Sequence, residues 1–142
     1  GKPIEQMALD IRAGYDQAAA SNGAIKSVNP VGEAWTRAMT LGIADSNPYD
    51  GIELNKVNLW TYDPYHASDH GHYPEDLVVF GHLTGKDPRS LGENECSAYE
   101  LGMSRTQVSA LQQAAFEQLA SEGKVTANPL VLPRPVSPEH CQ

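Results

Sequence analysis

The chain has 142 residues, 40% of them hydrophobic and 20% charged, a composition that is ordinary for a single globular domain with a modest core. Its formal charge of -8, with ten scattered lysines and arginines, argues against binding to a phosphate backbone, so we expect no nucleic-acid partner. No apolar run approaches the roughly 20 residues that a membrane helix needs, so we expect no membrane partner either.

The first helical pattern begins almost at once, as it would in a piece cut from inside a longer chain. Apolar residues recur every three or four positions, which predicts a helix from residue 4 to about residue 21 with one buried stripe. The stripe consists of Ile4, Met7, Ile11, Tyr15 and Ala18.

Short apolar segments alternate with helical patterns in the first half of the chain. Residues 24–28 read as a strand, and residues 57–60 read as a strand or extended run that leads into the loop that follows. A second helical pattern starts at Val31, and residues 44–51 are dense in turn formers, which predicts a surface loop. Such alternation is typical of a parallel α/β sheet, whose active sites lie at the carboxyl ends of the strands. The second helix is expected to turn Ala34, Trp35, Ala38, Met39 and Leu41 toward the core.

The chemically densest stretch is 60–73, which holds three of the five histidines. Within it, Asp63-Pro64-Tyr65-His66 suits a type I turn, with Asp at the first position and Pro at the second. The Asp63 carboxylate could then accept the Nδ1 proton of His66, which would leave the other ring nitrogen as a general base. This pair would be half of a catalytic triad that lacks its nucleophile.

Two other interpretations of this loop stay open. Asp69, His70 and His72, with His66 as a possible fourth ligand, are residue types that suit zinc, although their spacing matches no standard zinc motif. Alternatively they are solvated residues, with Asp69 near the N-terminus of a helix whose first turn contains Pro74.

The sequence pattern in the second half of the chain predicts two further helices and a tail. The helix after Pro74 is expected to end at a Gly85 cap, and Ser104 with Gln107 forms a capping box that opens a helix reaching to about Gly123. We expect residues 1–123 to form one α/β domain and residues 124–142 an extended tail with four prolines. The apolar stripe of the last helix is Val108, Leu111, Ala115 and Leu119.

The only cysteines, Cys96 and Cys141, have no metal-ligand spacing. A single disulfide and two reduced thiols are both open, and the disulfide would fit a secreted or periplasmic protein. We therefore expect an exported protein.

Residues 63–68, followed by Gly71-His72-Tyr73 and an apolar helix, resemble the last motif of the SGNH (GDSL-type) serine hydrolases, Asp-x-x-His. Residues 30–35 look like the strand-to-helix segment that precedes this motif in exported bacterial members, and the resemblance runs approximately from Pro3 to Leu119. It implies a three-layer, flavodoxin-like α/β fold and cleavage of a small-molecule ester through an acyl-enzyme, without a cofactor. It also implies that His66 is the general base and that Asp63 orients it.

The chain departs from this family where the nucleophile should be. The family's Gly-Asp-Ser motif and its Gly-x-Asn motif are absent before residue 63, and Gly92-Glu93-Asn94 has the right letters but follows the histidine. We therefore expect the C-terminal portion of such a hydrolase, completed by a serine-bearing N-terminal segment or chain and inactive or weakly active alone. The alternative is a non-catalytic binding domain with a divalent metal in the 66–72 loop.

Overall fold

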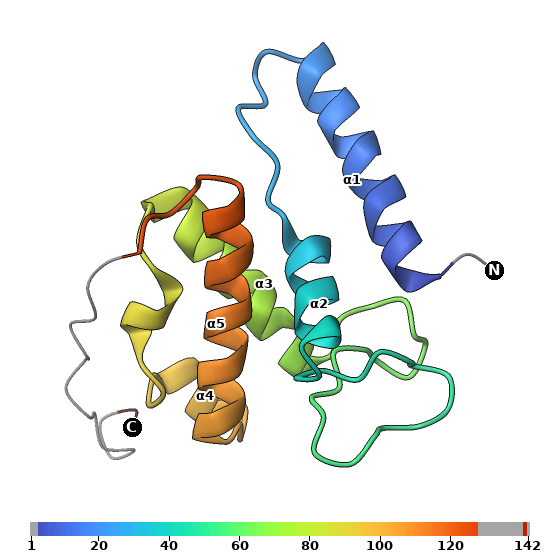
Figure 1. Cartoon of the computed structure of the whole chain (residues 1–142), viewed down its shortest axis with the longest axis vertical. Coiled ribbons are helices and arrows are strands. Elements are labelled where there is room, and N and C mark those ends of the chain that lie inside the picture. The colour runs from blue at the N-terminus through green and yellow to red at the C-terminus, as the bar shows by residue number, and fades with distance from the viewer. Residues whose placement is uncertain (1–2, 128–140, 142) are drawn as a thin grey trace.

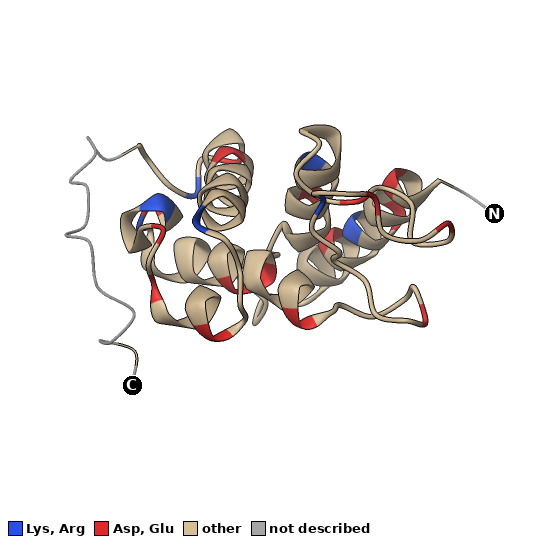
Figure 2. Ribbon diagram, turned by 90° about the horizontal axis from the view of Figure 1, so that it is seen from below, with Lys and Arg blue, Asp and Glu red and all other residues tan. Residues whose placement is uncertain are grey.

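The computed structural model describes residues 3–127 and residue 141, and these form an assembly of helices. Helices α2, α3 and α5 pack against one another, whereas α1 leans against α2 and extends away from the others (Figure 1). Acidic and basic positions are distributed over helices and loops alike (Figure 2). None of the described helices is long and apolar enough to cross a membrane. In chain order the elements are α1 (Ile4–Ser21), α2 (Val31–Thr40), α3 (Asp69–Thr84), the 3-10 helix η1 (Pro88–Leu91), α4 (Cys96–Glu100) and α5 (Arg105–Ser121).

The predicted α/β fold, and with it the three-layer SGNH-type sheet, is wrong for this chain. The described residues contain no sheet, only a parallel bridge between Ala44 and Val57 and an antiparallel bridge between Trp60 and Ala67. Residues 24–28 lie outside any helix or strand. A strand is stabilised by pairing with a neighbour, and the described chain supplies no neighbour for this one.

The core lies between α2, α3 and α5, and here the periodicity argument succeeds. Four of the five predicted core residues of α2 are buried, but Leu41 is half exposed. All four residues of the predicted stripe in α5 are buried. Trp35 and Trp60 meet edge to face, with ring centroids 4.8 Å apart. Residues with almost no exposure include Leu59, Leu77, Leu111, Leu119, Val57, Val78 and Val108.

Helix α1 has the predicted bounds, but its predicted buried stripe is wrong because no residue of α1 is buried. The helix is held mainly by Arg12, which donates hydrogen bonds to Glu33 at 2.8 Å and to Glu122 at 2.9 Å. The hydrogen bonds to Glu122 raise the pKa of Arg12, against the opposing effect of burial. A partly buried ion-pair network therefore helps to fix α1, and Ile4 of the predicted stripe packs partly buried against the core.

Two predicted helix caps are present, and one predicted helix start is wrong. Gly85 caps α3 with φ 68°, and Ser104 and Gln107 form the predicted capping box of α5. Helix α3, however, begins at Asp69, so Pro74 lies inside the helix and not in its first turn. The reason is Ser68, whose hydroxyl accepts a hydrogen bond from the Gly71 N–H at 3.0 Å and caps the helix earlier than expected.

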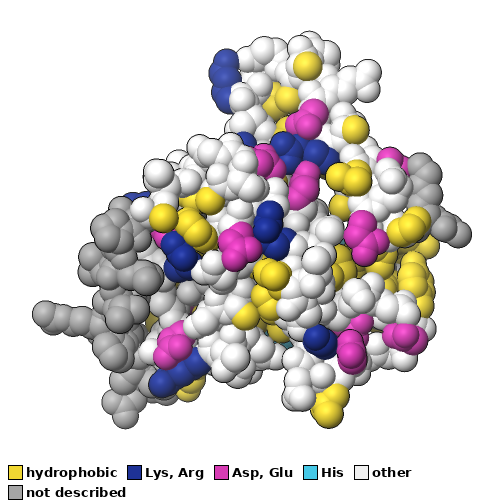
Figure 3. All heavy atoms as spheres, viewed as in Figure 1, with side chains coloured by type: hydrophobic (Ala, Val, Ile, Leu, Met, Phe, Trp, Pro, Cys, Tyr) yellow, Lys and Arg dark blue, Asp and Glu magenta, His cyan; other side chains and the backbone are white. Residues whose placement is uncertain are grey.

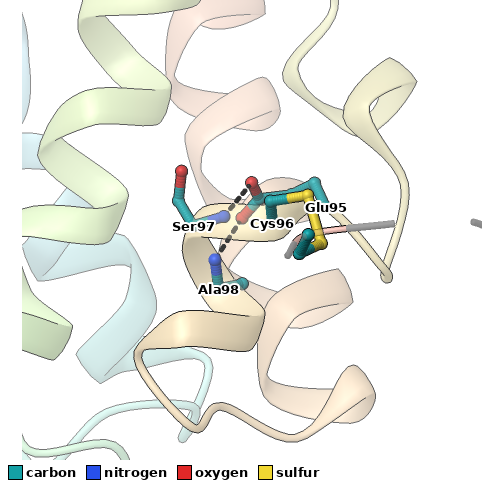
Figure 4. The surroundings of a disulfide bond; sticks show 5 residues. Glu95, Cys96, Ser97 and Ala98 are labelled. Carbon is teal, nitrogen blue, oxygen red and sulfur yellow. Dashed lines mark hydrogen bonds between the residues drawn. A yellow bond between two sulfur atoms is a disulfide. The ribbon is translucent and has the colours of Figure 1, made fainter. Parts of the chain in front are cut away.

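Cys96 and Cys141 form a disulfide, which settles the two options that the sequence left open. Cys96 opens α4, a short helix that we did not predict, and the carboxylate of Glu95 caps it by accepting from the N–H groups of Ser97 and Ala98 (Figure 4). The four prolines of the predicted tail lie outside the described residues.

The loop at 44–53 is organised by Asp45, whose side chain is buried. Its two carboxylate oxygens accept hydrogen bonds from the backbone N–H groups of Glu53 at 2.6 Å and Asn47 at 2.8 Å. Both hydrogen bonds lower the pKa of Asp45 below its ordinary value, and the bond from Glu53 has the larger effect. The ionised carboxylate therefore stabilises the folded loop.

Asp45→Asn should lower the free energy of unfolding at pH 7 by about 1–3 kcal/mol, because its amide cannot accept both hydrogen bonds. A lowered folded-state pKa contributes stability that is complete above about pH 5 and is lost as the pH falls below about 4. Urea denaturation at several pH values should show a shallower acid dependence in the variant than in the wild type. The exposed Asp50, changed to Asn, is the control, and equal effects of the two variants would contradict this role.

Candidate functional site

The loop that joins segment 57–60 to α3 is closed at its base by backbone hydrogen bonds. The Thr61 N–H donates to the His66 carbonyl at 2.9 Å, and the Ser68 N–H donates to the Leu59 carbonyl at 2.9 Å. Leu59 is fully buried, so this base is anchored in the core while residues 62–66 project from it. The core therefore fixes where the loop begins and ends.

Asp63 organises the interior of the loop. Its Oδ1 accepts hydrogen bonds from the Thr61 hydroxyl at 2.5 Å and from the N–H groups of Tyr65 at 3.0 Å and His66 at 3.1 Å. The Thr61 hydroxyl, followed by the His66 ring, lowers the pKa of Asp63 well below its usual range. The His66 N–H donates to the Asp63 side chain and not to the Asp63 carbonyl, so the hydrogen bond of the predicted type I turn is not formed. The carboxylate, and not a backbone turn, brings positions 63 and 66 together.

The predicted contact between Asp63 and His66 is present: Oδ2 lies 2.5 Å from Nδ1. The aspartate can only accept, so Nδ1 carries the proton and Nε2 presents a lone pair in the neutral ring. The imidazole is 79% exposed, against 31% for the Asp63 side chain. Within the described residues Nε2 has no hydrogen-bond partner. The pair therefore offers an oriented base to a group that approaches from outside.

No serine, threonine or cysteine side chain of the described residues is hydrogen-bonded to the His66 ring, whose partner is Asp63. The nearest serine in sequence, Ser68, is committed to structure: its hydroxyl donates to the Asn58 carbonyl at 2.7 Å and accepts from the Gly71 N–H. The described chain thus holds a base with its orienting carboxylate, but no nucleophile for it.

The other residues of the loop cluster are directed to different places. Asp69 is the first residue of α3, the His70 Nε2 lies 2.9 Å from the Leu101 carbonyl oxygen, and the His72 Nδ1 lies 3.1 Å from the Glu75 carboxylate. No group of three or more His, Cys, Asp or Glu residues in the described part of the chain is arranged to hold a metal ion. The structure therefore does not assemble Asp69, His70 and His72 into one site.

The sequence did not predict a second polar cluster, which is centred on His82. The residues that contact His82 are too far from it in sequence to leave a local signal. The His82 Nε2 lies 3.0 Å from the Ser27 hydroxyl and 3.2 Å from the Lys124 ammonium, and its Nδ1 lies 2.5 Å from the Asn29 side-chain oxygen. Burial, followed by the charge of Lys124, lowers the pKa of His82. The facing cation disfavours the imidazolium that a catalytic base must become, and the neutral Asn29 amide stabilises it less than a carboxylate would. We interpret this cluster as a tether that holds residues 27–29 against α3.

No family model matches the chain, and neither a curated protein nor a solved structure matches it.

Proposed function

We propose that Asp63 and His66 are the acid-and-base half of the catalytic triad of a serine ester hydrolase, and that they act on a serine outside this 142-residue sequence. The observation that carries the proposal is the 2.5 Å contact between the Asp63 Oδ2 and the His66 Nδ1, combined with an outward-facing ring.

The chemistry assigns one role to each atom. As the serine oxygen attacks the ester carbonyl, the His66 Nε2 takes its proton, and it later returns a proton to the leaving alcohol. The ionised Asp63 holds the ring in the required tautomer and stabilises the imidazolium. Donors to the developing oxyanion must come with the serine. The substrate class is a small-molecule ester, and no cofactor takes part.

The disulfide between Cys96 and Cys141 bears on location. Disulfides form and persist in oxidising compartments and are rare in the cytosol. It supports the proposal that the protein is secreted or periplasmic.

The test compares two samples. The first, called the native assembly, is the polypeptide as it occurs naturally together with any protein bound to it. The second is the isolated 142-residue chain. A fluorophosphonate probe should label a serine in the native assembly and should not label the isolated chain. His66→Ala should abolish the labelling, because the serine then has no base. The readout is labelled peptide, identified by mass spectrometry.

His72→Ala is the matched control, since His72 is also an exposed histidine that contacts a carboxylate three residues away. Its labelling should equal that of the wild type. Labelling that survives His66→Ala would contradict the proposal. So would stoichiometric zinc in the purified chain that is lost on His70→Ala, which would establish the binding-domain alternative.

A further inference from the structure

Helix α1 ends in a turn that begins with Asn22 and Gly23, the only Asn-Gly pair in the sequence. The turn lies at the end of α1 that projects from the molecule (Figure 1), and in the space-filling view this end stands clear of the main body (Figure 3). Both residues are exposed, and a β-carbon added at position 23 would meet no atom within 4 Å beyond its chain neighbours. Water therefore reaches both residues freely.

The side chain of Asn22 is folded back along the chain. Its Oδ1 accepts a hydrogen bond from the Ala24 N–H at 3.0 Å. This is the contact of an Asx turn, in which the side chain bonds its own backbone two residues on. The bond holds the side chain over the peptide group that joins Asn22 to Gly23, and it draws electron density from the Asn22 Cγ. The Gly23 N–H has no hydrogen-bond partner among the described residues. An electron-poor carbon therefore lies beside a nitrogen that is free to attack it.

Two further contacts favour loss of the proton from the Gly23 nitrogen. The Asn22 carbonyl, which shares a peptide group with this nitrogen, accepts a hydrogen bond from the Ile25 N–H at 2.9 Å. The Lys26 ammonium donates to the Gly23 carbonyl at 2.7 Å and so places a positive charge within the turn. Hydrogen bonds and a nearby opposite charge both stabilise the deprotonated form of a group. Glycine also has no side chain that could obstruct the approach of its nitrogen.

We propose that Asn22 is a site of spontaneous deamidation through a cyclic imide. The Gly23 nitrogen gives its proton to hydroxide and forms a bond to the Asn22 Cγ. The bond from Cγ to Nδ2 breaks, and Nδ2 takes a proton from water and leaves as ammonia. Water then adds to one of the two carbonyl groups of the imide and opens the ring. Opening at one carbonyl gives aspartate, and opening at the other gives isoaspartate, in which the main chain runs through the side-chain carbons.

Asn58 provides a matched comparison within the same chain. Its Oδ1 accepts a hydrogen bond from the Trp60 N–H at 3.1 Å, which is the same contact two residues on that Asn22 makes. The residue after it, Leu59, is fully buried, so its nitrogen cannot move toward the Asn58 side chain without disturbing the core. The leucine side chain also obstructs the attack. Asn58 therefore stays intact in the folded chain, although its side chain makes the same turn.

The modification changes the end of α1 in two ways. Either product carries a negative charge at the C-terminus of the helix, where the helix dipole already places partial negative charge. Isoaspartate also adds a carbon atom to the main chain, which disturbs the hydrogen bond between the Ile25 N–H and the carbonyl of position 22. Deamidation therefore loosens the turn that joins α1 to residues 25–29.

Peptide mapping by mass spectrometry tests this on the 142-residue chain, incubated in mildly alkaline buffer both folded and in urea. In the folded chain the peptide with Asn22 should gain about 1 Da, the difference between an amide and a carboxyl group, and the peptide with Asn58 should not. In urea both peptides should gain this mass. Gly23→Ala should slow the reaction of Asn22 about tenfold or more, which corresponds to about 1.4 kcal/mol in the barrier. The variant should fold, because the added methyl group enters open space.

Three outcomes would overturn the proposal. An Asn22 that stays intact in the folded chain but reacts in urea would show that the turn blocks the attack. Equal rates for the wild type and for Gly23→Ala would show that the nitrogen of position 23 does not attack. A product that contains aspartate and no isoaspartate, which chromatography separates at equal mass, would indicate direct hydrolysis of the amide without an imide. None of these results involves Asp63 or His66, so the proposed function stands or falls separately.

Discussion

Asp63→Asn should reduce the kcat/KM of ester hydrolysis by the native assembly about 10⁴-fold. Asparagine has nearly the same size, and its oxygen can still accept the hydrogen bonds that Asp63 Oδ1 receives from Thr61, Tyr65 and His66. Its amide nitrogen, however, then faces the His66 Nδ1 and can only donate. The ring must accept there and carry its proton on Nε2, where a base is needed. The variant therefore keeps the structure of the loop but loses the general base at the His66 Nε2.

The readouts separate this tautomer effect from a structural one. Nitrogen NMR of His66 should show the proton moving from Nδ1 to Nε2, while the stability of the chain changes little. Glu75→Gln makes the same exchange in the matched His72 pair and should leave hydrolysis unchanged. A loss of less than about tenfold in the Asp63→Asn variant would contradict the role of the carboxylate.

Gly71→Ala should destabilise the chain by more than about 3 kcal/mol, at the upper end of the usual cost of overpacking. A β-carbon at position 71 would lie 2.2 Å from the Leu59 carbonyl oxygen and 3.0 Å from the Trp35 ring. The carbonyl belongs to buried backbone that also accepts the Ser68 N–H, so it cannot move without disturbing the start of α3. Accommodating the methyl group requires the helix and the segment 57–60 to separate.

Gly14→Ala is the matched control, another glycine within a helix but with no atom within 4 Å of the added β-carbon. It should stabilise the chain by about 0.5–1 kcal/mol, because alanine loses less conformational freedom in a helix. Urea denaturation followed by tryptophan fluorescence measures both variants. A Gly71→Ala midpoint equal to that of the wild type would show that the close approach to Leu59 is not rigid.

The elements that could be predicted are those whose cause lies within a few residues. The period of the apolar residues located α1, α2 and α5, and the Ser104–Gln107 pair located the start of α5. Helix α3 was found with the wrong start, because Ser68 and Pro74 are both acceptable near a helix N-terminus and the sequence does not rank them. The short helix α4 has no period long enough to detect.

The prediction of a sheet is wrong for the same reason as the prediction of a buried stripe on α1. An apolar run such as 24–28 shows that a segment would suit a strand, but pairing needs a neighbour, and the described chain has none. A stripe such as that of α1 shows which face would be buried, but burial needs a surface to cover it. Both predictions describe what the segments require, and the tertiary structure of the described residues does not satisfy either requirement.

For the candidate site, the contact between Asp63 and His66 was predicted, but from a type I turn that is not formed; the Asp63 carboxylate itself makes the local hydrogen bonds that bring the two residues together. Their surroundings depended on contacts between distant residues. The anchoring of the loop on Leu59, the use of Ser68 as a cap and the dispersal of His70 and His72 to Leu101 and Glu75 follow from how α3 packs. Local spacing thus determined which groups pair, and only tertiary packing decided which of them are committed to structure and which face outward.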